Sequence, residues 1–410
     1  MPEPVPAQAG EPRVVLTSGG VTSPAGFLAG GVAAGIKASG ALDLGILASE
    51  RPALVAAVFT QHALPAPPVV LTRERVARGR ARAVIVNSGN ANAATGAAGL
   101  ADARAMARLL AERLSIPEEE ALVASTGIIG VRLPLAAIAA AVPQLPLAPD
   151  GGHAFARAIL TTDTRPKEAA VRLALPGRTV TIGGCAKGAG MIHPNLATML
   201  AFFTTDAPLD LAWLQATFRQ AVDDTFNLID VDGDTSTNDT VLLLANGLAG
   251  GPPIAGGEDG ALFAAGLRRL AEHLARAIVQ DAEGATKLIE VRVSGAPSRA
   301  VARAIARTVA SSLMVKTAVH GNDPNWGRIY GAAGNAGVPI DERRLTIAIG
   351  NVLVFRHGQP QDYNHPAAVA ALQGSEVVIA LDLGAGSAAA TAWGCNLSEQ
   401  YVTLNSVYTT

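Results

Sequence analysis

The sequence predicts an α/β protein whose sheets are mixed and largely antiparallel. Helical and strand-like patterns alternate along the 410 residues. Residues 171–175 and 178–182 each alternate apolar and polar side chains, and only Pro176-Gly177 separates them, which is typical of a β-hairpin. A composition of 49% hydrophobic and 16% charged residues favours a sizeable core over disorder. Because hairpin strands pair antiparallel, a regular βαβ series is not expected.

The remaining elements follow from periodicity and capping residues. Short apolar runs predict buried strands, and apolar positions at helical spacing predict amphipathic helices, one of them capped by Asp206 and another by Ser298. The predicted strands are residues 83–86, 122–125, 196–203, 288–293, 345–349, 377–381 and 401–404. The predicted helices are residues 101–114, 209–226, 261–282 and 298–313. Pro- and Gly-rich stretches predict linkers at residues 143–152 and 247–257.

Composition and charge narrow the class of protein. The net charge is −2 and no basic patch occurs, so we expect no nucleic-acid partner. Two cysteines do not make a disulfide framework, and a reducing, cytoplasmic setting fits them. The sequence contains no stretch of about 18 uncharged apolar residues, so we expect no membrane-spanning helix. Residues 1–12 lack the apolar segment of a signal peptide and are expected to form a loose tail.

No metal site is expected. Neither the CxxC spacing nor the HExxH pattern occurs. The acidic stretch DVDGDTSTND at residues 230–239 fails the calcium-loop pattern, because loop positions six and twelve hold Thr235 and Val241. We interpret it as a polar loop ordered by its own side chains, available to line a site.

The segment GGCAKGAGMIHPNLAT, residues 183–198, allows two interpretations. It is not a P-loop, since no Ser or Thr follows Lys187. In one interpretation Thr198 is an ordinary residue of an apolar strand. In the other, its hydroxyl attacks the Ala197 carbonyl, and hydrolysis of the resulting ester frees the α-amine of Thr198. An α-amine has a pKa near ~8, so it can serve as the base for its own hydroxyl.

Three further loops carry polar groups at turns. Thr126-Gly127 follows a predicted strand and could aim donors at an oxyanion, or it could be a simple turn. NSGNANAATG (residues 87–96) and HGNDPNWGR (residues 320–328) are turn-rich loops with N–H groups available for anions. A strand-like run leads directly into the C-terminal NSVYTT, which indicates a docked end.

Together these segments resemble the ornithine acetyltransferase (ArgJ) family. The resemblance covers about residues 19–410, in family order. The matching stretches are NSGNANAATG, STGIIG, TTDTRPK, KGAGMIHPNLATMLAFFTTD, VDGDTSTNDT, HGNDPNWGRI and the terminal Tyr-Thr-Thr.

The resemblance implies a fold and a reaction. The fold would be the layered α/β arrangement shared with DmpA-like proteins. Cleavage between Ala197 and Thr198 would give an interwoven α chain (1–197) and β chain (198–410) that are not independent domains. Thr198 would take the acetyl group from N-acetylornithine and pass it to glutamate in a ping-pong reaction of arginine biosynthesis.

The resemblance also implies site residues and partners. The oxyanion hole would be Thr126 and Gly127, and the substrate contacts would be Thr161, Lys187, Thr198, Glu283, Asn405 and Thr410. Lys187 would hold a carboxylate, and Glu283 an ammonium of either ornithine or Thr198. The chains would assemble as an α2β2 heterotetramer. No cofactor is expected; acetyl-CoA stays open as a second donor, because monofunctional and bifunctional members share these motifs.

Two alternatives remain. A β-aminopeptidase-like amidohydrolase would cut itself in the same way but pass the acyl group to water. A non-enzymatic protein that binds an anion through the Gly- and Asn-rich loops would remain a single chain with no acetyl group on Thr198.

Overall fold

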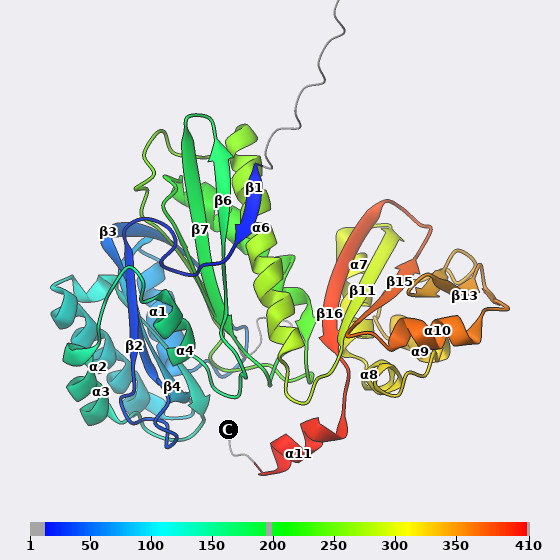
Figure 1. Cartoon of the computed structure of the whole chain (residues 1–410), viewed down its shortest axis with the longest axis horizontal. Helices are drawn as coiled ribbons and strands as arrows, with labels where there is room; N and C mark the ends of the chain where they lie inside the picture. The colour runs from blue at the N-terminus through cyan, green and yellow to red at the C-terminus, as the bar shows by residue number, and fades with distance from the viewer. Residues whose placement is uncertain (1–12, 194–198, 408–410) are drawn as a thin grey trace, which may run out of the picture.

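The computed structural model describes residues 13–193 and 199–407, and it contains two mixed sheets. The first sheet has nine strands and the second has seven (Figure 1). In the first, the order is β1 (Val14–Thr17), β6 (Lys167–Leu175), β7 (Arg178–Lys187), β8 (Leu200–Thr205), β10 (Thr240–Ala245), β3 (Leu44–Phe59), β4 (Arg80–Asn90) and β5 (Ala121–Ile128), with β2 (Phe27–Val32) paired to β3. In the second, it is β14 (Gln359–Pro360), β13 (Val352–Arg356), β12 (Thr346–Ile349), β15 (Glu376–Asp382), β11 (Leu288–Ala296), β16 (Ala388–Cys395) and β9 (Ile229–Asp230).

Most neighbouring strands are antiparallel, as the sequence predicts. The predicted hairpin is β6–β7, paired from Lys167↔Ala186 to Leu175↔Arg178. The parallel pairs of the first sheet are β8–β10 and β4–β5. Each is linked through intervening helices or another strand, as parallel pairing requires.

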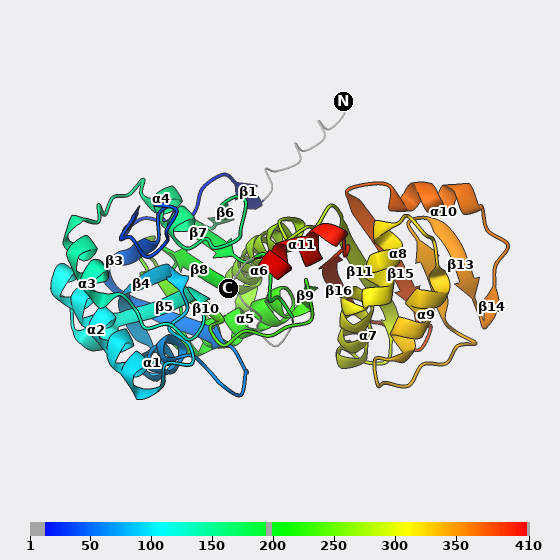
Figure 2. The same ribbon diagram turned by 90° about the horizontal axis from the view of Figure 1, so that it is seen from below.

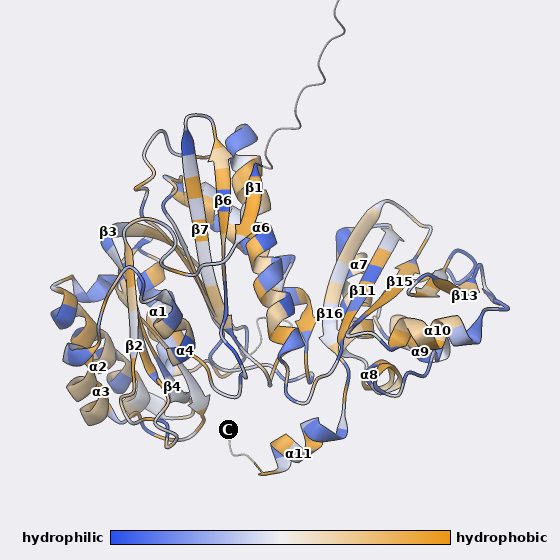
Figure 3. Cartoon of the chain, viewed as in Figure 1, coloured by the Kyte–Doolittle hydropathy of each residue, from blue (hydrophilic) through white to orange (hydrophobic). Residues whose placement is uncertain are grey.

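Helices cover the sheets. They are α1 (Pro67–Val76), α2 (Gly96–Leu114), α3 (Leu135–Ala141), α4 (Gly152–Ala158), α5 (Leu211–Asp223), α6 (Gly257–Gln280), α7 (Arg299–Ser311), α8 (Leu313–His320), α9 (Trp326–Gly334), α10 (His365–Leu372) and α11 (Glu399–Val407). On one face of the first sheet, α1 to α3 pack over β4 and β5 while α5 and α6 cover the other end; α4 packs on the opposite face. α6 lies between the two sheets, and its mixed colouring in Figure 3 fits its amphipathic sequence.

The centre of the first sheet is buried on both faces. Every residue of β8 and β10 is buried, which explains the unbroken apolar run in the sequence. Phe202 packs edge-on against Phe155 on one face, whereas Phe203 meets Phe218 and Phe226 on the other. Packing against both faces of the sheet therefore fixes the position of β8.

Several predicted elements need correction. The helix predicted at 101–114 begins at Gly96, and the helix predicted at 298–313 ends at Ser311. The strand predicted at 196–203 begins at Leu200; Met199 precedes it, and residues 194–198 lie outside the described residues. The helix predicted at 209–226 begins at Leu211 with Asp210 as its cap, because a β-bridge between Leu209 and Ile254 holds the preceding residues extended. Asp206, the predicted cap, instead accepts hydrogen bonds from the N–H groups of Thr181 and Ala25.

The helix predicted at 261–282 spans Gly257–Gln280, so Glu283 follows the helix. The strand predicted at 401–404 is part of the helix α11. The C-terminal helix leaves the second sheet and runs back towards the first (Figures 1 and 2). Of the predicted docked end, Asn405 contacts Glu283 and Val407 is 81% exposed, while residues 408–410 lie outside the described residues. The predicted linkers are loops held to this fold by the bridges Ala29↔Ala148 and Leu209↔Ile254.

Within residues 13–193 and 199–407, no helix combines the length and apolar character needed to cross a membrane.

Replacing Phe203 by Ala tests the two-sided packing of β8. Phe203 is 1% exposed, and the mutation removes a ring that two others contact, so we expect a loss of about 3–5 kcal/mol in the free energy of unfolding. Urea unfolding followed by circular dichroism measures this. Leu64→Ala is the control, since Leu64 is 73% exposed and should change stability by about 0.5 kcal/mol or less. A Phe203→Ala loss below about 1 kcal/mol would contradict the packing argument.

Candidate active site

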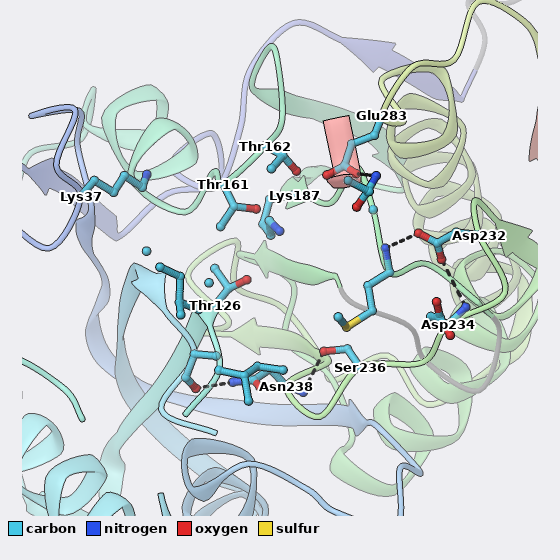
Figure 4. Close-up of a pocket in the computed structure, with 18 of the residues that line it drawn as sticks. Lys37, Thr126, Thr161, Thr162, Lys187, Asp232, Asp234, Ser236, Asn238 and Glu283 are labelled. Atoms are coloured by element: carbon cyan, nitrogen blue, oxygen red, sulfur yellow. Dashed lines mark hydrogen bonds between the residues drawn. The ribbon is translucent and has the colours of Figure 1, made fainter. Parts of the chain in front are cut away.

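A cavity of ≈ 510 Å³ opens where the first sheet meets the loops that lead to the second sheet. Segments far apart in the sequence line it, from the loop after β2 to the C-terminal helix α11 (Figure 4). Its polar lining residues include Lys37, Ser39, Thr126, Thr161, Thr162, Lys187, Asp232, Asp234, Ser236, Asn238, Glu283, Tyr401 and Asn405.

The structure brings six predicted site residues together here. These are Thr126, Gly127, Thr161, Lys187, Glu283 and Asn405. The other three, Ala197, Thr198 and Thr410, lie outside the described residues. The loop HGNDPNWGR does not line the cavity. Its His320 instead pairs with Glu399 at 3.2 Å, at the start of α11.

Thr126 and Gly127 end β5 against the neighbouring strand β4. Gly127 has φ +130°, and a Cβ there would lie 2.3 Å from the carbonyl carbon of Gly89, so only glycine fits. The pairing becomes irregular between Gly89 and Asn90. Thr126, which is 3% exposed, and Gly127 line the cavity near the ends of these two parallel strands.

Two motif loops hold these strand ends in place. The Ser125 hydroxyl donates a hydrogen bond to the side-chain carbonyl oxygen of Asn87 at 2.6 Å. The Asn238 amide donates to the Ala91 and Ser125 carbonyls at 2.6 and 2.9 Å. The polar character of NSGNANAATG and VDGDTSTNDT thus has a structural reason: their amides join the two loops to β5.

Lys187 is a buried cation at the end of β7, and it is held beside Asp163. The Lys187 ammonium lies 3.9 Å from Asp163, and both side chains are at most 3% exposed. Asp163 also accepts hydrogen bonds from the Lys167 ammonium at 2.6 Å and from the Gly188 N–H at 2.7 Å. Burial lowers the pKa of Lys187, and Asp163 opposes that shift.

Asp163 stays ionised in this setting. Burial alone would raise its pKa, but Lys187, Lys167 and the Gly188 N–H together hold it at about 2. Lys167 is shared with a second carboxylate, Asp281, also at 2.6 Å. The two lysines and two carboxylates form a compact, internally compensated group.

The GAG stretch after Lys187 allows Glu283 to reach the cavity. The Glu283 N–H donates to the Ala189 carbonyl at 2.9 Å. A Cβ at Gly190 would lie 2.7 Å from the Glu283 carboxylate, so a larger residue there would displace that side chain. Asn405 of α11 donates to the same carboxylate at 2.8 Å. Glu283 is therefore positioned from two sides, and it keeps acceptor capacity for a ligand.

Asp232 holds the segment that enters residues 194–198. It accepts hydrogen bonds from the N–H groups of Met191 (2.5 Å) and Ile192 (2.9 Å), and from the Tyr401 hydroxyl (3.2 Å). Burial raises the pKa of Asp232. Burial, followed by the charge of Asp232, raises the pKa of Tyr401, which keeps the phenol protonated as a donor.

On the other side of those residues, Met199 is also fixed. Its N–H donates to Asp239 at 2.9 Å, and its carbonyl accepts from the Thr240 N–H at 3.2 Å. Burial raises the pKa of Asp239 well above its ordinary value. The chain is thus anchored on both sides of residues 194–198, by the partly buried Asp232 before them and by the buried Asp239 after them.

The sequence argument missed three residues of this site: Lys37, Asp163 and Tyr401. It described residues 230–239 as a polar loop available to line a site, and Asp232 from that loop lines the cavity. Asp163 lies inside a quoted motif, but nothing local separates a ligand from a structural carboxylate. Lys37 had a usable signal, because only five lysines occur among 32 basic residues and this one interrupts an apolar stretch. Within the described residues, no group of three or more His, Cys, Asp or Glu side chains could bind a metal ion.

Comparison with known proteins agrees with the motifs. The model of the ArgJ family matches residues 28–410. The arginine biosynthesis bifunctional protein ArgJ of Symbiobacterium thermophilum is 52% identical over 398 residues, which cover 96% of this chain and 99% of that protein. The protein of the same name from Thermosynechococcus vestitus is 48% identical over 414 residues, which cover 96% of this chain and 98% of that protein.

A solved structure also matches in part. The ornithine acetyltransferase of Mycobacterium tuberculosis, complexed with ornithine, is 46% identical, covers 44% of this chain and 98% of that chain, and has a TM-score of 0.42. The family match and the two full-length relatives settle the assignment that the motifs predicted. The chain belongs to the ArgJ family.

Proposed function

We propose that this chain is a self-cleaving acetyltransferase of arginine biosynthesis that moves an acetyl group from N-acetylornithine to glutamate. The observation that carries the proposal is the meeting of six predicted site residues in one cavity. The relatives named as arginine biosynthesis proteins over nearly the whole length support the pathway.

Self-cleavage supplies the nucleophile. The Thr198 hydroxyl attacks the Ala197 carbonyl, and the peptide bond becomes an ester with a free amine. Water then cleaves the ester, leaving a carboxylate on Ala197 and a free α-amine and hydroxyl on Thr198. The anchoring of Met191 and Met199 on either side supports this role, since a defined geometry is what an intramolecular attack requires.

Acetyl transfer then runs in two halves. The Thr198 hydroxyl attacks the acetyl carbonyl of N-acetylornithine, its proton passes to the leaving amine, and ornithine departs. The α-amine of glutamate attacks the acetyl ester, and Thr198 leaves with its proton restored. Thr126 and Gly127 would stabilise the oxyanion of both steps, where one donor is typically worth about 3 kcal/mol.

The charged residues would recognise the amino-acid part of each substrate. Lys187 would hold the α-carboxylate as a fixed positive charge. Glu283, with its carboxylate open to the cavity, would hold the side-chain ammonium of the donor. Thr161, Asn405 and Thr410 would add directional hydrogen bonds. The reaction needs no cofactor, and acetyl-CoA would acylate Thr198 by the same attack.

The wider setting is part of the proposal. The α and β chains would stay together because β8 and β10 of the β chain lie between β7 and β3 of the α chain in one sheet. They would assemble as α2β2 in the cytoplasm.

Denaturing intact-mass spectrometry after brief exposure to N-acetylornithine tests the function. We expect two chains, with the one that starts at Thr198 heavier by one acetyl group. Adding glutamate should remove that group and produce N-acetylglutamate. Release of acetate alone would favour the amidohydrolase, and a single unmodified chain would contradict the proposal. Thr198→Ala should remain one 410-residue chain without activity; an active Thr198→Ala protein would refute the mechanism.

Glu283→Gln tests which ammonium that carboxylate binds. Gln keeps the size and an acceptor for Asn405 but removes the charge. If Glu283 binds the donor's side chain, kcat/KM for acylation by N-acetylornithine should fall about 10- to 100-fold, with a much smaller effect on deacylation by glutamate. Stopped assays of the two half-reactions measure this. An equal fall in both would assign Glu283 to the Thr198 amine instead. Arg104→Met, on the exposed face of α2, is the control for a distant charge change.

A further inference from the structure

The charged side chains of the cavity are spread from one end to the other. Lys37 lies at one end, Glu283, Asp232 and Asp234 lie towards the other, and Lys187 lies between them (Figure 4). Lys37 extends from its own wall of the cavity towards Thr161 and Lys187 in that view. A ligand with an anionic group in addition to the one that Lys187 binds would find a second cation there.

The backbone around Lys37 is held rigidly by one buried carboxylate. Asp43 is 0% exposed and accepts hydrogen bonds from the N–H groups of Ala34 (2.6 Å), Ile36 (2.7 Å) and Lys37 (2.9 Å). All of its bonds go to backbone, so Asp43 fixes the loop while leaving the Lys37 ammonium available. A cation placed by a rigid loop loses little entropy on binding a ligand.

Two contacts position the Lys37 side chain. Its aliphatic stem lies over Gly89, where a Cβ would be 3.0 Å from Cγ of Lys37. Its Nζ donates to the Leu42 carbonyl at 2.9 Å, which leaves two N–H donors. Among the residues that the structure describes, none forms an ion pair with this ammonium. Gly89 pairs with Gly127, so Lys37 stands next to the strand ends proposed as the oxyanion hole.

We propose that Lys37 binds the side-chain carboxylate of the acceptor and so selects a dicarboxylic amino acid. This rests on the proposed function, in which donor and acceptor use the cavity in turn. Both present an α-carboxylate, which Lys187 would take. They differ in the side chain, which is an ammonium in the donor and a carboxylate in the acceptor. The opposite charges of Glu283 and Lys37 match that difference.

The charge state of Lys37 gives the selection a pH dependence. Burial lowers the pKa of Lys37 to about 8; Asp43 opposes the shift, Lys187 adds to it, and Asp163 opposes it weakly. The ammonium is therefore present below about pH 8 and is lost as the pH rises above that value. Preference for a carboxylate side chain over a neutral one should decline over the same range.

The experiment compares glutamate with glutamine as acceptors of the preformed acetyl-enzyme. The two share an α-amine and α-carboxylate and differ only in side-chain charge, so the ratio of their kcat/KM values isolates recognition of the carboxylate. In Lys37→Met we expect kcat/KM for glutamate to fall about 10- to 100-fold, with a change of about 3-fold or less for glutamine. Lys37→Arg should restore much of the preference for glutamate and shift its loss to higher pH. Arg104→Met should leave the ratio unchanged.

An unchanged ratio in Lys37→Met, with acylation by N-acetylornithine intact, would overturn the assignment while leaving the proposed function standing. No acetyl-enzyme in the unmodified protein would remove the proposed function and this inference with it. If Lys37→Met does not give folded, cleaved protein, the pH series of the unmodified enzyme decides. A ratio that stays constant between about pH 6.5 and 9.5 would overturn the proposal.

Discussion

The site depends on one buried carboxylate, Asp163. A buried ammonium such as that of Lys187 is costly unless an anion lies near it, and Asp163 supplies that anion. Asp163 needs Lys167 and the Gly188 N–H to remain ionised, and Lys167 also binds Asp281 at the end of α6. This set of contacts joins the loop after α4, strands β6 and β7 and the end of α6. The loop position that carries Thr161 and the direction of Glu283 both follow from it.

The second constraint is the order of strands in the first sheet. Positions 197 and 198 fall between β7 and β8, which are neighbours in that sheet, and β8 pairs with β10, which pairs with β3. The two strands after residue 197, β8 and β10, therefore lie between strands from before it, β7 on one side and β3 on the other. Neither the segment before residue 197 nor the one after it could bury β8 on both faces alone, so a chain cut there would keep its architecture through the shared core rather than through a peptide bond.

The cavity draws on both sheets, and this gives it two chemically different sides. The first sheet supplies strand ends and glycines, where backbone and cations come close together. The helix α11 returns from the second sheet with Tyr401 and Asn405, which hold Asp232 and Glu283. His320, the first residue of HGNDPNWGR and the last of α8, lies 3.2 Å from Glu399 at the start of α11, so a motif outside the cavity still supports the element that completes it. The separation of positive from negative charge is a property of this assembly, and no single motif carries it.

The sequence by itself determined what depends on local interactions. The period of two around Pro176-Gly177 predicted the β6–β7 hairpin, and the apolar run at residues 196–203 predicted a buried strand, of which the structure shows Leu200–Thr205. Long motifs were enough to assign the family and to name six residues that meet in the cavity. The tertiary structure decided the rest. Residues 401–404 alternate like a strand but form a helix, because contacts with Glu283 and Asp232 come from one helical face. Lys37 lines the cavity because Asp43 holds its loop in place and its side chain lies over Gly89. The position of a charge in a cavity depends on contacts between segments, which no local pattern encodes.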